Sequence, residues 1–171
     1  VTDNEFSGQT FIGPNPADLG FANQFTTPNV PRQLVVLASG PGSGVLFACN
    51  VVSGTAGGLN IAAQPQGNQL ATIDVNNATI QYNAFSGIST RFADALRARG
   101  TGATISGNIF AGGTPVGVEI GSSSAATAHV VNNNFASTYT LAALGNGSAA
   151  QLDAQSNWWG SATGPTIASN P

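Results

Sequence analysis

The residues of this chain that could carry acid–base or metal chemistry are few. The chain has one histidine, one cysteine, four arginines, no lysine and seven carboxylates, which are Asp3, Glu5, Asp18, Asp74, Asp94, Glu119 and Asp153. Cleavage of a glycosidic bond needs two carboxyl groups about 5 to 9.5 Å apart across the substrate. A calcium-dependent lyase needs clustered aspartates and a basic residue. No two carboxylates are adjacent in sequence, so the sequence predicts no catalytic residue, no metal site and no cofactor.

The remaining charged residues favour a structural role. Asp74, either Arg97 or Arg99, and Glu119 follow one another at intervals close to the repeat described below. This spacing predicts an outward column of alternating charges, which would stabilise neighbouring strands by a few tenths of a kcal/mol. The alternative is a face that contacts sugar. His129 is predicted to point outward without a partner, so it indicates neither a metal site nor a catalytic triad.

Composition excludes several classes of function. Only 6% of the 171 residues are charged, and the net charge is -3. Such a chain has no basic surface for phosphates, so a role on nucleic acid or on anionic membranes is disfavoured. It has no apolar run long enough to span a bilayer, which excludes membrane insertion. Because the chain begins Val-Thr-Asp, we expect that a leader has been removed or a longer chain cut. The lone Cys49 is predicted to be a buried, inert thiol.

A sequence repeat of constant period organises the chain. Three segments align with equal steps between them: ATIQYNAFSG (78–87), ATISGNIFAG (103–112) and AHVVNNNFAS (128–137). Fainter copies occur at 1–8, at 47–54 with a longer step to the next copy, and at 152–158 after a shorter step. In the last copy, Trp158 is predicted to stand where the other copies have phenylalanine. Asn77-Ala-Thr79 and Asn146-Gly-Ser148 fit the glycosylation pattern, which matters only in a host that glycosylates.

The repeat predicts an all-β parallel solenoid with about 22 to 25 residues per coil. The units are β-branched and punctuated by Gly and Asn, and stacked coils lie about 4.8 Å apart. Equivalent residues then form columns: Ile80, Ile105 and Val130; Phe85, Phe110 and Phe135; Asn83, Asn108 and Asn133. The asparagines are expected at a turn with positive φ, bonded to one another. We predict one domain, 1–171, with an irregular Pro-rich entry and partial first coil (1–44), regular coils (45–160) and a tail (161–171).

The repeat I-x-x-N-x-F-x-G and the closing N-W-W-G-x-x-x-G-P (157–165) resemble a family of secreted β-helix repeat proteins with pectate-lyase-like architecture, found in bacteria and some archaea. The resemblance covers roughly residues 45 to 171. It implies a right-handed parallel β-helix with three faces on a secreted, extracellular or cell-surface protein.

Two functions remain open at the level of sequence. The first is a non-enzymatic structural or adhesive protein whose coils stack end to end, so that the partner is a second copy of the chain. Val1 and Phe6 at one end, and Trp158 and Trp159 at the other, would then be end caps or subunit contacts, since a contact that does not close on itself generates a filament. The alternative is a polysaccharide-binding or polysaccharide-degrading β-helix, similar to a lyase or hydrolase, with carbohydrate as the partner.

Overall fold

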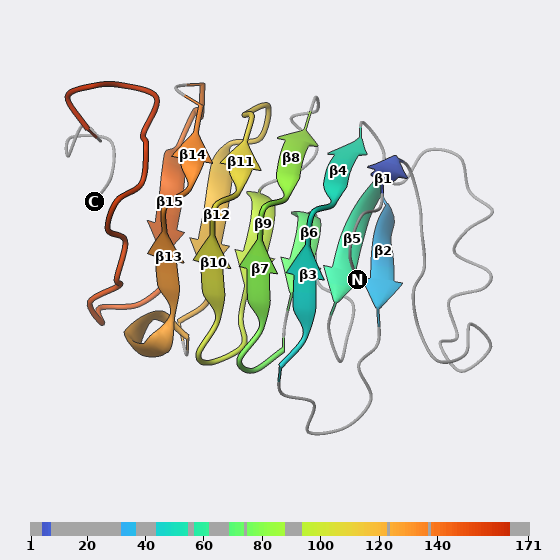
Figure 1. Ribbon diagram of the computed structural model, residues 1–171, viewed down its shortest axis with the longest axis horizontal. Coiled ribbons are helices and arrows are strands. Elements are labelled where there is room, and N and C mark those ends of the chain that lie inside the picture. Colours follow the sequence, from blue (N-terminus) through green and yellow to red (C-terminus); the bar gives the residue numbers. More distant parts are fainter. Residues whose placement is uncertain are drawn as a thin grey trace.

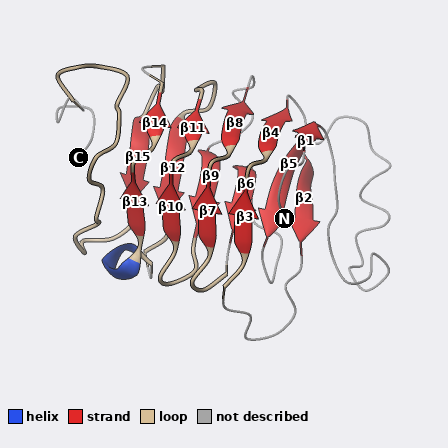
Figure 2. Ribbon diagram, in the orientation of Figure 1, coloured by secondary structure: helices blue, strands red, loops and turns tan. Residues whose placement is uncertain are grey.

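The short alternating runs of the sequence form short strands, which stack in parallel into three sheets (Figure 1). The computed structural model describes residues 5–7, 32–36, 44–54, 57–61, 69–73, 75–87, 94–122, 124–136 and 138–164. Helical structure in these ranges is limited to one 3-10 turn, Ala125–Thr127 (Figure 2). No helix there has the length and apolar character needed to cross a membrane. The chain is therefore an all-β parallel solenoid.

Each sheet collects one short strand from successive coils. Sheet A contains β3 (Leu46–Ala48), β7 (Thr79–Gln81), β10 (Thr104–Ser106) and β13 (His129–Val131). Sheet B contains β1 (Glu5–Ser7), β4 (Val51–Gly54), β8 (Ala84–Gly87), β11 (Ile109–Phe110) and β14 (Asn134–Phe135). Sheet C contains β2 (Arg32–Val36), β5 (Gly57–Ile61), β6 (Gln69–Ile73), β9 (Asp94–Ala98), β12 (Val116–Ile120) and β15 (Ala142–Asn146).

Constant coil length keeps the columns in register. Ile105 of β10 pairs with Ile80 of β7 on one side and with Val130 of β13 on the other. Phe110 of β11 lies in the same way between Phe85 and Phe135. A shift of the pairing by a single position would move every inward side chain to the outer face, so the period itself fixes which residues form the core.

The longer step that precedes Ile80 has a structural cause in sheet C. In sheet A, β3 pairs directly with β7, so Phe47 lies beside Ile80. Between these two strands the chain enters sheet C twice, as β5 and then as β6, which pair with each other. The other edge of β5 pairs with β2. The longer step therefore adds one strand to sheet C and leaves the register of sheets A and B unchanged.

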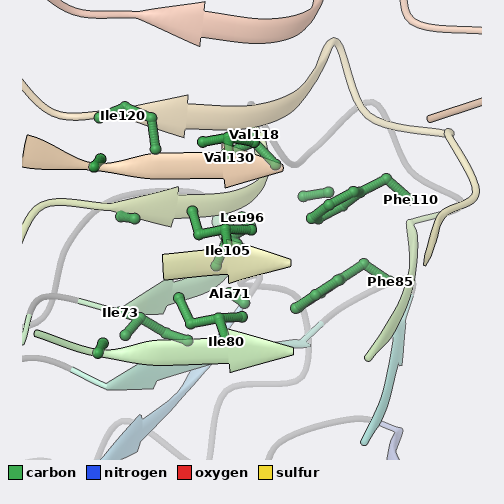
Figure 3. Close-up of a cluster of buried hydrophobic side chains, with 14 of the residues drawn as sticks. Ala71, Ile73, Ile80, Phe85, Leu96, Ile105, Phe110, Val118, Ile120 and Val130 are labelled. Carbon is green, nitrogen blue, oxygen red and sulfur yellow. The ribbon is translucent and has the colours of Figure 1, made fainter. Parts of the chain in front are cut away.

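Inward side chains from all three sheets form one apolar core (Figure 3). Ile80, Ile105 and Val130 of sheet A are fully buried. They face Leu96 and Val118 of sheet C. Burial of each such side chain stabilises the fold by about 1.5 to 3 kcal/mol. The core thus runs along the stacking axis.

Two strands of the entry section lie at the edges of the sheets that the described residues form. β1 pairs only with β4 among the described strands, with Phe6 beside Val52, and β2 pairs only with β5. The first segment of the chain therefore follows the phase of the repeat. The sequence also has a weak copy of the repeat at 23–25, which predicts a further coil, and these residues lie outside the described ranges.

Candidate functional site

A column of asparagines, buried except for the half-buried last member, runs along the turn between sheets A and B. We call it the asparagine ladder; its members are Asn50, Asn83, Asn108, Asn133 and Asn157. The side-chain amide of Asn83 donates to Oδ1 of Asn108 at 2.9 Å, and that of Asn108 donates to Oδ1 of Asn133 at 3.0 Å. The same oxygens accept the backbone N–H of Asn83 and Asn108. One amide thus satisfies two buried donors of the neighbouring coil, where no strand pairing is available.

The conformation of this turn corrects two expectations. Positive φ was expected at the ladder asparagines, but it occurs at the position before them, as at Tyr82 (φ 56°) and Asn132 (φ 58°). The turn residue carries the strained backbone, and the asparagine that follows turns its amide into the protein. Cys49 occupies the turn position of its coil, with φ 56°. Its thiol is consequently exposed, and the prediction of a buried cysteine was wrong.

An aromatic stack lies beside the ladder. Ring centroids are 5.0 Å apart between Phe85 and Phe110, and 4.9 Å apart between Phe110 and Phe135. Trp159 extends the stack on Phe135 at 5.0 Å. Trp158, predicted for this position, is instead 50% exposed. In each of these coils the stacked ring follows the ladder asparagine at the same distance along the chain. Because Asn157 is the ladder asparagine of the last coil, Trp159 takes the stacked position and Trp158 faces outward.

Tyr139, which sequence reasoning did not place, closes the side of this stack. Its ring meets Phe135 edge-on, with centroids 6.4 Å apart. Its hydroxyl donates to the backbone oxygen of Phe110 at 2.9 Å. Burial raises the pKa of Tyr139 above its ordinary value, an effect that a backbone hydrogen bond from Gly112 opposes in part. The neutral phenol is therefore the form that suits the fold.

Three charged residues meet on sheet C. Nη2 of Arg97 lies 2.5 Å from a carboxylate oxygen of Glu119 in the next coil and 3.2 Å from Asp94 in its own strand. The register places Thr72 opposite Arg97. Asp74 itself lies outside the described residues, and Arg99 follows the end of β9. Asp94 is only 2% exposed, so this group suits cross-coil stabilisation better than contact with a ligand.

His129 has a partner that sequence reasoning missed. Its Nδ1 lies 2.8 Å from Oδ2 of Asp153, and the two residues pair across neighbouring coils. The separation of His129 and Asp153 along the chain is 24, the same as that of the ladder asparagines of these coils, Asn133 and Asn157. An alignment of the last two coils on their ladder asparagines therefore places Asp153 opposite His129. His129 is 56% exposed, as expected for an outward residue.

The described residues hold no group of three or more His, Cys, Asp or Glu side chains arranged to bind a metal ion. Of the expected end residues, Val1 lies outside the described ranges, and Phe6 is placed only by the pairing of β1. Comparison with protein-family models, curated proteins and solved structures found no match for this chain.

Proposed function

We propose that this chain is a non-enzymatic structural or adhesive solenoid that acts outside the cell. In this proposal it is a secreted or cell-surface protein of a bacterium or archaeon, and coils of separate copies stack end to end into a fibre. A right-handed coil is part of the proposal, supported by the strong preference of parallel strand connections for that hand. The resemblance of the closing N-W-W-G-x-x-x-G-P motif to secreted β-helix proteins supports the location.

The observation that carries the proposal is the uniform contact between successive coils. From Asn83 to Asn157 the same amide hydrogen bonds recur at each step, and the rings beside them stack at 4.9 to 5.0 Å. In the proposal, a coil of a second copy that has the same asparagine and aromatic positions continues these contacts. Such a contact between two copies is heterologous and does not close, which is the condition for a filament.

The charged side chains agree with a structural role. Glu119 and Asp94 contact Arg97, and Asp153 contacts His129. Two of these three contacts join neighbouring coils. A hydrolase of the alternative kind needs a carboxyl pair free to face its substrate, whereas these carboxylates contact cationic or ionisable partners.

Electron microscopy of the purified chain, with sedimentation velocity over a range of concentrations, tests the proposal. We expect fibres with an axial spacing of about 4.8 Å, the separation of stacked strands. Trp159→Arg should abolish them, because it places a charge in the terminal aromatic column. Leu141→Arg is the matched control, since Leu141 is exposed and outside that column. Monomers at every concentration, or fibres that persist in folded Trp159→Arg, would contradict end-to-end stacking.

A further inference from the structure

The outward face of sheet B carries a column of exposed side chains that the core does not explain. We call it the sheet B strip; its members are Val51, Ala84, Ile109, Asn134 and Trp158, which pair in this order across five coils. Val51 is 44% exposed, Ile109 51% and Trp158 50%. The next outward column contains only small residues where it is described: Ser86, Ala111 and Ala136. An aligned series of exposed apolar groups is typical of a contact between proteins.

The ion pairs of the described residues lie on other sides of the molecule. They join side chains on sheets A and C. From Val51 to Trp158, no residue described on the outer face of sheet B is charged. A face that meets its own copy can bring like charges together, which is costly. The sheet B strip is therefore a face that can meet a second copy without repulsion.

The size of the strip selects the kind of partner. Five coils at about 4.8 Å and two outward columns about 7 Å apart give a face of roughly 300 Å². A stable protein complex buries roughly 800 Å² on each partner, so one strip is too small, whereas about three consecutive strips exceed that area. This inference rests on the proposed fibre, in which the strip recurs in every copy. A second fibre of the same chain has the same axial repeat, so it contacts successive strips at once.

We infer that two fibres of this chain pair face to face through their sheet B strips, with their axes antiparallel. The side chain of Ala84 ends at Cβ, and Ala84 pairs with the exposed Ile109 of the next coil. A two-fold axis between these two positions places Ile109 of each copy on Ala84 of the other, so the same contact is made twice. The paired sheets lie about 10 Å apart, as in a β-sandwich.

The charged residue described at the start of this column favours the antiparallel arrangement. Glu5 pairs with Val51 and therefore precedes the strip. Across the two-fold axis, the position of Glu5 falls opposite that of Trp158. Parallel fibres in register would instead set each position against its own copy, with Glu5 opposite Glu5 and Ile109 opposite Ile109. Antiparallel pairing keeps the carboxylates apart and sets a large side chain against a small one.

Electron microscopy of fibres of the whole chain, with paired and single fibres counted, tests this inference. We expect pairs in the wild type. Ala84→Ile sets a large side chain against Ile109, and Ile109→Ala removes the large side chain, so each should lower the paired fraction by about tenfold or more. The double variant exchanges the two groups and should restore the pairs. Leu141→Ala is the matched control, because Leu141 is 66% exposed but lies outside the strip.

Circular dichroism confirms that each variant is folded before its fibres are counted. Wild-type fibres that are all single, or pairs that persist in both single variants, would overturn pairing through this face and leave end-to-end stacking intact. Loss of pairs in the double variant as well would overturn the reciprocal contact of Ala84 with Ile109. Absence of any wild-type fibre would overturn this inference together with the proposed function.

Discussion

Replacement of Asn108 by alanine should destabilise the protein far more than its size suggests. Asn108 is fully buried. Its Oδ1 accepts the backbone N–H of Asn83 at 2.9 Å and the side-chain amide of Asn83 at 2.9 Å. In Asn108→Ala both donors lose this acceptor inside the protein. Each buried donor left unpaired costs about 1 to 3 kcal/mol, so we expect a loss of about 4 kcal/mol in the free energy of unfolding.

Thermal and urea unfolding followed by circular dichroism measure this loss. For a chain of this length, about 4 kcal/mol corresponds to a fall in Tm of about 8 to 16 °C. The matched control is Asn134→Ala in the next coil, where the asparagine is exposed. The control should stay within about 0.5 kcal/mol of wild type. A loss below about 1 kcal/mol for Asn108→Ala, or equal losses for both variants, would refute the argument that the ladder amides satisfy buried donors.

Three further changes test other parts of the structure. Trp159→Ala should lower the free energy of unfolding by about 2 to 3 kcal/mol because it removes the ring stacked on the core. Trp158→Ala should lower it by less than about 1 kcal/mol. Equal losses in urea unfolding would mean that Trp158 is also a core residue. Arg97→Met should lower the free energy of unfolding by about 3 kcal/mol because it removes the cation that faces a buried aspartate. Glu119→Gln should lower it by less than about 1 kcal/mol. Equal losses would contradict the greater importance of the buried Asp94 contact. Burial raises the pKa of Tyr139, so the unfolded chain loses that proton first and stability should fall above about pH 10. Urea unfolding on either side of that pH should show a smaller fall in Tyr139→Phe, and an unchanged fall would contradict this.

The repeat made the fold class predictable from sequence. With one period from Ile80 to Val130, every equivalent residue must keep the same column, and parallel strands are the structure that aligns identical residues at each step. The structure has these parallel strands. The longer step before Ile80 could not be interpreted in the same way. An extra strand in sheet C lengthens the step along the sequence, but it leaves the register of sheets A and B unchanged.

Errors in the last coil arose from the choice of reference residue. Aligning the coil on Leu152 gave too short a step and placed Trp158 in the core. The structure keeps a step of 24 at the ladder, because the buried amide is the most constrained group of the coil. Measured from Asn157, the stacked ring is Trp159, and Asp153 falls opposite His129. The signal was present in the sequence, but only the hydrogen bonds show why the asparagine sets the register.

Repetition identifies the scaffold, and departure from repetition indicates where function should be sought. Inward positions are constrained by neighbours on both sides, so they recur as isoleucine, phenylalanine and asparagine in coil after coil. Outward positions have no such constraint, and in the outward column of sheet B they change from Val51 through Ile109 to Trp158. Packing explains none of these exposed groups. The outer surface, and not the core, is therefore where the described residues differ from coil to coil.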